Sequence, residues 1–260
     1  MYTVALYTGR IQGGRQYQED EYANVKISDN TYFCGIFDGH GGGSISKMCA
    51  ERFPEVIKQG MVEMPYDLAK TVHMSFYIMD KIALEQYNSQ HVGSTVVFCL
   101  MHPDAIWFAN AGDSMSMIGL VDGSCMVMSQ EHKVELEKER IIADGGFITN
   151  FDGTSRVNGN LNVSRGIGDG ELKRWVTCNP YVRSISNNLD SIKYIFMGSD
   201  GVWDVLSAEA LNEIIKTSFL SLDKTENYMT EIVNRIIETA YSMGSTDNIT
   251  ATLIEITKAA

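Results

Sequence analysis

Four aspartates of this chain share one setting, because each stands in a Gly-containing segment at one end of an apolar, strand-like run. They are Asp38, Asp113, Asp200 and Asp247. A single Asp beside a Gly is more often an ordinary turn than a ligand. Four of them together favour another interpretation, since carboxylates from separate strand ends can converge on a hard cation such as Mg²⁺ or Mn²⁺. Neighbouring glycines let backbone carbonyls approach the same ion.

A second cluster lies near the N-terminus, where Arg15 is followed by Glu19 and Asp20. The planar fork of an arginine can hold a phosphate while nearby carboxylates hold metal-bound water. Taken alone, this cluster would be a surface salt bridge. His40, two residues after Asp38, would likewise be an ordinary surface histidine if it stood alone.

The sequence lacks the motifs of cysteine-dependent phosphatases and of nucleotide-binding loops. The nearest match to a Cys-x5-Arg loop, Cys178 to Arg183, is one residue short, and no Gly-x4-Gly-Lys-[Ser/Thr] loop is present. The five cysteines are scattered, without a Cys-x-x-Cys pair or a His/Cys cluster for zinc. They are expected to be reduced thiols in a cytoplasmic or nuclear protein.

The composition of the chain limits the classes of partner that the protein is expected to bind. With 21 Lys and Arg against 33 Asp and Glu, the net charge of -12 disfavours nucleic acid. No signal peptide is evident, and the longest apolar run, near Val96–Met101, is too short to cross a membrane. No linker or repeat divides the 260 residues, so a single domain over residues 1–260 is expected.

The elements that must position these residues come in two helical blocks separated by strands. Strands are predicted at Ala23–Ile27, Thr31–Phe37, Ser94–Met101, Ala105–Ala109, Met115–Val121, Ile192–Met197 and Ile249–Ile256. Helices are predicted at Ser44–Lys58, Pro65–Tyr87, Val134–Ala143, Ala208–Phe219 and Glu226–Tyr241. This order favours an antiparallel α+β architecture over a doubly wound sheet. The Gly- and Asn-rich stretch Asp144–Ser186 is interpreted as long loops that line a site.

Taken in order, seven segments resemble the metal-dependent protein phosphatases of type 2C. They are Gly14–Asp20, Asp38–Gly42, Gly93-Ser94-Thr95, Ala109–Ser114, Arg156–Asp169, Ser199–Val205 and Gly244–Thr250. The resemblance implies an α+β fold of two packed antiparallel β-sheets flanked by α-helices on both sides, a four-layer αββα sandwich. It also implies a serine/threonine phosphatase that acts on phosphoproteins, and a monomer is expected.

The same resemblance implies a site with two Mn²⁺ or Mg²⁺ ions. Asp38 resembles the carboxylate that bridges both ions, and the carbonyl of Gly39 a ligand of one of them. Asp200 and Asp247 resemble ligands of the other ion. Glu19 resembles the residue that holds the centre directly or through water.

Asp113, together with Asp200, resembles a weaker third metal site. Asp169 resembles a residue that supports this site. Arg15 resembles the phosphate clamp and His40 the general acid. Two ions lower the pKa of a bridging water, so the implied reaction is direct attack of a metal-bridging hydroxide on phosphorus.

Several positions depart from the family's common pattern. Met115 stands where an Arg is usual, Glu131-His132-Lys133-Val134 replaces Asp-His-Lys-Pro, Asn162 replaces a small apolar residue, and Tyr181 replaces an acid. Two alternatives to an active protein phosphatase stay open. One is a pseudophosphatase acting as a binding module, which would typically lack one of Arg15, Asp38, Asp200 and Asp247. The other is a hydrolase of small phosphoesters.

Overall fold

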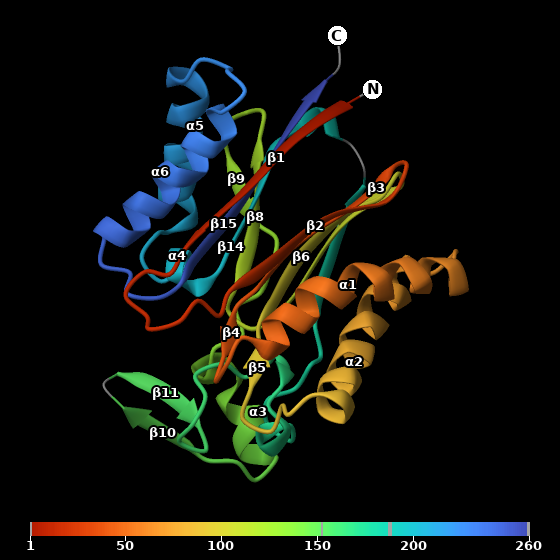
Figure 1. The fold of residues 1–260 in the computed structure, drawn as a ribbon, viewed down its shortest axis with the longest axis vertical. Helices are drawn as coiled ribbons and strands as arrows, with labels where there is room; N and C mark the ends of the chain where they lie inside the picture. The colour runs from red at the N-terminus through yellow and green to blue at the C-terminus, as the bar shows by residue number, and fades with distance from the viewer. Residues whose placement is uncertain (1, 152, 187–188, 259–260) are drawn as a thin grey trace.

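Two five-stranded antiparallel sheets face each other, and helices cover the outer face of each (Figure 1). The computed structural model describes residues 2–151, 153–186 and 189–258. The first sheet has the strand order β1-β15-β14-β8-β9, and the second has the order β13-β7-β6-β3-β2. This arrangement confirms the predicted four-layer αββα sandwich.

The bounds of the elements are as follows. The first sheet contains β1 (Tyr2–Ile11), β15 (Ile249–Lys258), β14 (Ile192–Gly198), β8 (Met115–Leu120) and β9 (Cys125–Val127). The second contains β13 (Tyr181–Ser186), β7 (Ala105–Ala111), β6 (Val96–Met101), β3 (Thr31–Phe37) and β2 (Glu21–Ser28). Smaller pairings join β12 (Ile167–Gly168), β5 (Gly93–Ser94) and β4 (Gly39–His40), and form the hairpin of β10 (Ile148–Phe151) and β11 (Thr154–Val157). The long helices are α1 (Ser44–Glu63), α2 (Leu68–Gln86), α5 (Ala208–Ser221) and α6 (Tyr228–Ser242). Short helical segments are η1 (Val134–Glu137), α3 (Lys138–Ala143), η2 (Gly170–Leu172), η3 (Leu189–Ser191) and α4 (Asp200–Trp203).

The central strands are apolar throughout because both of their faces are buried. In β6, Val96, Phe98 and Leu100 belong to the core beneath α1 and α2. Their neighbours Val97, Cys99 and Met101 belong to the core between the two sheets. Alternate side chains of a strand point to opposite faces, so a strand between two buried layers needs an uninterrupted apolar run.

Helix α6 covers the first sheet with the apolar stripe that its sequence predicts. Ile232, Val233, Ile236 and Ile237 pack against Leu253 and other residues of that sheet. Every predicted strand and helix has a counterpart, but the strand predicted at Ser94–Met101 is divided into β5 and β6, Val134–Ala143 is divided into η1 and α3, and α1 extends beyond its predicted end to Glu63. The stretch Asp144–Ser186 is less irregular than predicted, because it contains β10, β11, β12, η2 and β13 among its described residues.

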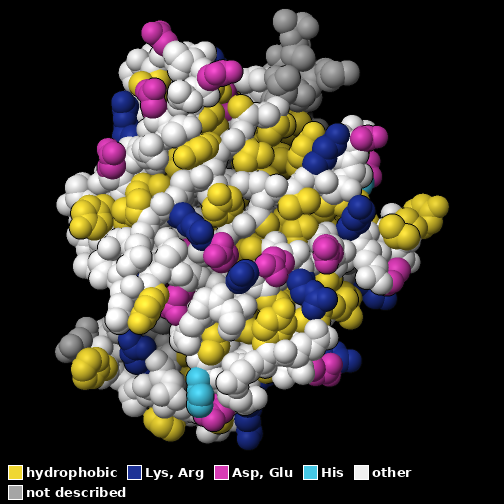
Figure 2. Space-filling view, viewed as in Figure 1, with side chains coloured by type: hydrophobic (Ala, Val, Ile, Leu, Met, Phe, Trp, Pro, Cys, Tyr) yellow, Lys and Arg dark blue, Asp and Glu magenta, His cyan; other side chains and the backbone are white. Residues whose placement is uncertain are grey.

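One end of the sandwich gathers the functional segments. Strand β14 runs antiparallel to β15, with Gly198 opposite Ala251, so the end of one strand meets the start of the other. The short strands β4 and β5 and the β10–β11 hairpin lie at this end, toward the bottom of the view (Figure 1). On the face seen in Figure 2, acidic and basic side chains are interspersed over the surface. No helix among the described residues is both long and apolar enough to cross a membrane.

Candidate active site

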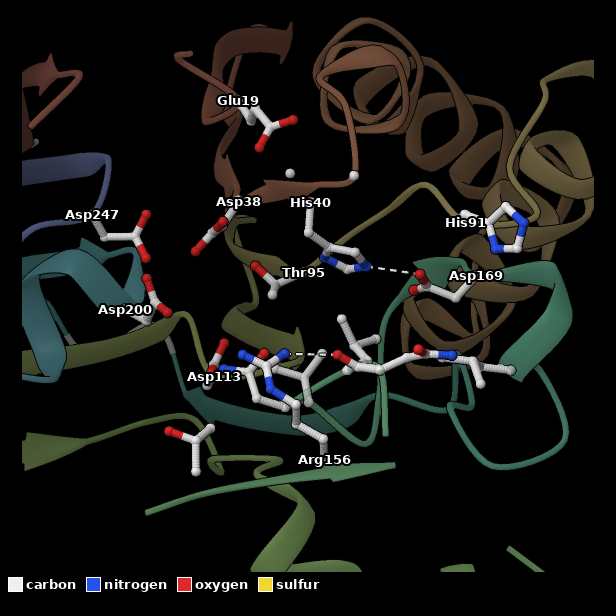
Figure 3. A pocket seen from close by; sticks show the side chains of 18 of the residues that line it. Glu19, Asp38, His40, His91, Thr95, Asp113, Arg156, Asp169, Asp200 and Asp247 are labelled. Atoms are coloured by element: carbon white, nitrogen blue, oxygen red, sulfur yellow. Dashed lines mark hydrogen bonds and ion pairs between the residues drawn. The ribbon is translucent and has the colours of Figure 1, made fainter. Parts of the chain in front are cut away.

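A cavity of about 1130 Å³ opens at this end of the sandwich. It is lined by the eight residues for which the sequence predicts metal-binding or catalytic roles: Arg15, Glu19, Asp38, Gly39, His40, Asp113, Asp200 and Asp247. Asp20, by contrast, lies outside it. In Figure 3, Asp38, Asp200 and Asp247 point toward one another, with Asp113 close by and Glu19 facing them. Side chains from distant parts of the chain therefore share one acidic space.

The turn after β3 is shaped by a close approach of two backbone segments. A Cβ atom on Gly39 would lie 2.6 Å from the carbonyl oxygen of Glu19 and 2.6 Å from the hydroxyl of Ser46. The Ser46 hydroxyl donates a hydrogen bond to that same carbonyl oxygen at 2.5 Å. Only glycine fits this position, and the result is that Glu19 lies beside Asp38.

Asn248, at the start of β15, fastens the N-terminal segment that carries Arg15 and Glu19. Its side-chain amide donates to the carbonyl oxygens of Gln12 at 2.8 Å and Tyr17 at 2.9 Å. Its side-chain oxygen accepts from the backbone N–H of Glu19 at 2.8 Å. The backbone N–H of Asn248 donates to Asp247 Oδ1 at 2.7 Å, so the same residue also orients Asp247.

The carboxylates of the cavity repel one another. Burial raises the pKa of Asp38 well above its ordinary value, and the charges of Asp200, Asp20 and Asp113 raise it further. The pKa of Asp200 is raised in the same way, first by burial and then by Asp113 and Asp247. Burial raises the pKa of Asp113 to about 6, although Lys133 opposes the shift. Such shifts mark a cluster that lacks sufficient positive charge.

Asp20 is buried next to the carboxylate cluster and binds the segments that carry it. It is fully buried, and its Oδ2 accepts hydrogen bonds from the hydroxyls of Ser199 at 2.9 Å and Thr250 at 2.6 Å. Burial raises the pKa of Asp20 to about 6, and these two hydrogen bonds oppose the shift. Asp20 thereby joins the start of β15 to the residue before Asp200.

The donor set of the cavity fits a hard divalent cation. Asp113 Oδ2 and Asp200 Oδ1 are buried oxygens without a hydrogen-bond partner, which is costly unless a cation or proton is supplied. Within the described residues, no three His, Cys, Asp or Glu side chains are already arranged to hold an ion. The fit therefore rests on unpaired oxygen donors and leaves coordination positions for water, as Mg²⁺ prefers.

Arg15 lies at the mouth of the acidic space. Its side chain is 58% exposed, and its Nη2 forms an ion pair with Asp247 Oδ2 at 2.5 Å. The β10–β11 hairpin borders the same cavity with Phe151 and Arg156, which sequence reasoning did not single out. Arg156 donates to the carbonyl oxygen of Asn160 at 2.7 Å.

His40 is held by a partner that the sequence did not reveal. Its Nε2 lies 2.8 Å from Asp169 Oδ1 (Figure 3). Asp169 adopts a left-handed backbone conformation with φ of 55°, which Asp tolerates better than most residues. A Cβ atom on Gly93 would lie 2.2 Å from Asp169 Oδ2 and 2.5 Å from His40 Nε2, so glycine makes room for the pair. Asp169 thus contacts His40, whereas the family resemblance had suggested support for a third metal.

The chain is similar to known proteins over nearly its whole length. The family model described as "Protein phosphatase 2C" matches residues 5–249. The chain therefore belongs to the protein phosphatase 2C family. Members of this family depend on Mg²⁺ or Mn²⁺.

The phosphatase 2C relatives are moderately similar in sequence. "Probable protein phosphatase 2C 32" of Oryza sativa subsp. japonica is 31% identical over 97% of this chain and 66% of its own length. "Protein phosphatase 1L" of Bos taurus is 30% identical over 98% of this chain and 72% of its own length. The chain spans 66%, 63% and 62% of the first three curated relatives, so it corresponds to part of those proteins.

Solved structures share the phosphatase 2C fold. A serine-threonine phosphatase 2C from Toxoplasma gondii superimposes with a TM-score of 0.79 at 22% identity, over 98% of this chain and 95% of that one. A C. elegans sex determining protein has a TM-score of 0.87 at 23% identity, over 97% of this chain and 64% of that one. At this level of identity the likeness concerns the fold.

A departure from the common phosphatase 2C pattern, Glu131-His132-Lys133-Val134, supports the site in this structure. Lys133 Nζ forms ion pairs with Asp204 at 2.8 Å and with Glu131 at 2.9 Å. Glu131, which replaces the usual Asp, is therefore paired with Lys133. Burial lowers the pKa of His132 to about 4, and the neutral ring accepts a hydrogen bond from the N–H of Gly112 at 3.2 Å. His132 therefore braces the turn that carries Asp113.

Proposed function

We propose that this chain is a metal-dependent protein phosphatase that hydrolyses phosphoserine and phosphothreonine by direct attack of water on phosphorus. The observation that carries the proposal is the uncompensated carboxylate cluster with an exposed arginine, Arg15, at its mouth. The cluster has raised pKa values and unpaired oxygens, so it needs cations. No cysteine is among the described lining residues of the cavity, which supports hydrolysis without a covalent phosphoenzyme.

The acidic residues would hold two divalent ions. Asp38 and the carbonyl oxygen of Gly39 would hold one ion, and Asp200 and Asp247 would hold the other. Glu19, which faces these aspartates, would hold metal-bound water. When bound, such ions lower the pKa of water and neutralise charge on the phosphoryl oxygens. Asp113 would hold a weaker third ion, and its unpaired Oδ2 supports this role.

Arg15 would orient the substrate. Its guanidinium is exposed at the cavity mouth and is already held toward the acidic space by Asp247. A planar guanidinium can form two parallel hydrogen bonds with phosphate oxygens, and this fixes the direction of the scissile bond. Loss of Arg15 is therefore expected to raise KM for the phosphopeptide.

His40 would protonate the departing serine or threonine oxygen. Asp169 holds Nε2 of the ring, so Nδ1 is the nitrogen left for proton transfer to the substrate. Asp169 does not need to contact the substrate, because its contribution is to fix the orientation of the imidazole ring through the contact at Nε2. Replacement of His40 is expected to lower kcat more than it alters KM.

The proposal is tested by turnover of a phosphothreonine peptide in Mn²⁺, Mg²⁺ or EDTA. Wild type is compared with Asp200→Asn and with Asp122→Asn, a matched change at an exposed turn aspartate. We expect metal-dependent turnover that EDTA and Asp200→Asn abolish and Asp122→Asn retains.

Two other outcomes would contradict the proposal. Folded wild type that binds Mn²⁺ but turns over none of several phosphopeptides would indicate a pseudophosphatase. A much higher kcat/KM for small phosphate esters than for any phosphopeptide would indicate a small-molecule hydrolase.

A further inference from the structure

A second cavity, of about 400 Å³, lies apart from the acidic one and shares none of its lining residues. Helix α2 contributes Tyr77 to its lining, and α3 contributes Arg140. The other lining residues come from the segment between α3 and β13: Arg165, Lys173, Thr177, Cys178 and Asn179. Both α2 and α3 lie toward the lower end of the molecule as viewed in Figure 1. We refer to this space as the basic pocket.

The charge of the basic pocket is opposite to that of the chain. Three of its seven lining residues are cationic and none is acidic, in a protein whose net charge is -12. Burial raises the pKa of the Cys178 thiol to about 12, so it stays neutral. The pocket therefore attracts anions.

The carboxylates behind the pocket neutralise only part of this charge. Glu137 accepts hydrogen bonds from Arg165 Nε at 3.1 Å and from Arg140 Nη2 at 2.9 Å. Asp80 accepts from Lys173 Nζ at 2.7 Å. Two carboxylates thus face three cations, which leaves an excess of one positive charge.

Unused donors accompany the excess charge. Arg140 Nε and Nη1 are buried and have no hydrogen-bond partner in the structure. Lys173 Nζ has two acceptors, Asp80 and the carbonyl oxygen of Gly166 at 3.1 Å, and an ammonium carries three donors. Buried arginine donors without partners are rare, and their charge adds to the positive field of the pocket, while the free donor of Lys173 is available to an acceptor oxygen of a ligand.

The shape of the basic pocket suggests more than a bare ion. Its volume is larger than one phosphate group requires, and one wall is the ring of Tyr77, which is 44% exposed. The Tyr77 hydroxyl donates to Asn179 Oδ1 at 3.1 Å, so the ring is held in place at the rim. A fixed aromatic face can pack against the carbon portion of a ligand.

We propose that the basic pocket is a binding site for a small organic phosphate. Its phosphate oxygens bind Arg165 and Lys173 beside the charge of Arg140, and its carbon portion packs against Tyr77. Phosphate matches this site because Arg165 Nη1 and Nη2 each keep one N–H beyond their bonds to Asn179 and Glu137, and the ammonium of Lys173 keeps a third donor. The proposal does not depend on phosphatase activity, since the pocket contains none of the residues of the acidic cavity.

The test uses the full chain labelled with ¹⁵N and kept in EDTA, so that the acidic cavity repels phosphate. Inorganic phosphate and the non-hydrolysable ester analogue methylphosphonate are titrated at constant ionic strength. The Nε–H signals of Arg140 and Arg165 and the backbone amides of residues 165–179 are followed by NMR. We expect saturable shifts, and about tenfold or greater weakening in both Arg140→Gln and Lys173→Gln.

Arg174→Gln is the matched control, because Arg174 is the exposed neighbour of Lys173 and does not line the pocket. It should bind as wild type does. Unsaturable shifts, equal affinity in Arg140→Gln, or shifts confined to the acidic cavity would overturn the proposal. So would binding of succinate without binding of either phosphate probe. If a variant fails to fold, the location of the wild-type shifts decides the question alone.

Discussion

Glu255 and the aspartates of the acidic cavity are enclosed carboxylates in opposite surroundings. Glu255, on β15, is 1% exposed and receives Lys193 at 3.1 Å, Lys224 at 3.0 Å and the hydroxyl of Tyr228. Burial alone would raise its pKa, but these hydrogen bonds outweigh it and the pKa is lowered. Asp113 is similarly buried at 2% exposure, yet it keeps one oxygen without a partner and its pKa is raised.

The difference shows how the same chemical group can support structure in one place and chemistry in another. Around Glu255 the chain provides its own cations, so the charge is satisfied by folding alone. Around Asp38, Asp113 and Asp200 the nearest charges are mostly of the same sign, so folding leaves an electrostatic cost. A cluster of that kind is stabilised by ions from solution.

The largest effect is expected for Asp38→Asn. Turnover of a phosphothreonine peptide in Mn²⁺ should fall by about 10³-fold or more, equivalent to about 4 kcal/mol of transition-state stabilisation. In EDTA the same variant should be more stable than wild type, because a carboxylate that its neighbours repel has been neutralised. Urea denaturation and steady-state kinetics measure the two effects. A variant that is both active and less stable would show that the cluster is structural.

The next effect is a pH dependence that exists only without metal. Asp20 and Asp113 have folded pKa values of about 6, above the ordinary value of 3.8, so the folded state binds more protons than the unfolded state between these values. The free energy of unfolding in EDTA should therefore fall as pH rises from about 4 to about 6.

Saturating Mn²⁺ should remove this decline, since the ion replaces the protons. Urea denaturation at several pH values, with EDTA or Mn²⁺, makes the comparison. Asp113→Asn should flatten the EDTA curve. A free energy of unfolding that increases over the same pH range in EDTA would contradict the assignment of raised pKa values.

Glu255→Gln should act in the opposite manner to Asp38→Asn. Loss of the carboxylate leaves Lys193 and Lys224 without their common partner, at a cost of about 1–3 kcal/mol of stability. Both lysines are partly exposed, which keeps the effect below that of a fully buried pair. Turnover in Mn²⁺ should stay within about twofold of wild type. A large loss of turnover in well-folded Glu255→Gln would break the contrast between the two regions.

The smallest effect is expected for Tyr228→Phe. This change removes one donor to Glu255 and keeps the ring, so stability should fall by about 1 kcal/mol. A double-mutant cycle with Glu255→Gln should show that the two changes are not additive, because they remove the same hydrogen bond. Additive losses would mean that Tyr228 contributes through packing alone.

Much of the fold could be predicted because the central strands are buried on both faces. The run Val96–Met101 is apolar at every position, and such a pattern can be recognised locally. Strand β1 was missed because it mixes polar and apolar residues and pairs with β15, at the far end of the chain. The β10–β11 hairpin was missed since most of its residues are exposed and show no periodicity.

The site was predicted less completely than the fold. The eight expected residues do line one cavity, but their metal-binding and catalytic roles stay predictions. The monomeric state also stays a prediction. So does the single domain over residues 1–260, and some of these residues lie outside the described ranges. Pairings such as His40 with Asp169 and Asn248 with Glu19 join residues 129 and 229 positions apart. Nothing in the local sequence specifies such partners, because the fold alone brings them together.

The pairing of β1 with β15 has a consequence for the newly made protein. These strands are in register from Tyr2 opposite Lys258 to Ile11 opposite Ile249, and β15 also separates β1 from β14. During translation, Arg15 leaves the ribosome long before Asp247 and Asn248, which are needed to hold its segment. A nascent chain that still retains Asp247 and β15 in the exit tunnel therefore has neither the ion pair between Arg15 and Asp247 nor its complete carboxylate cluster in place.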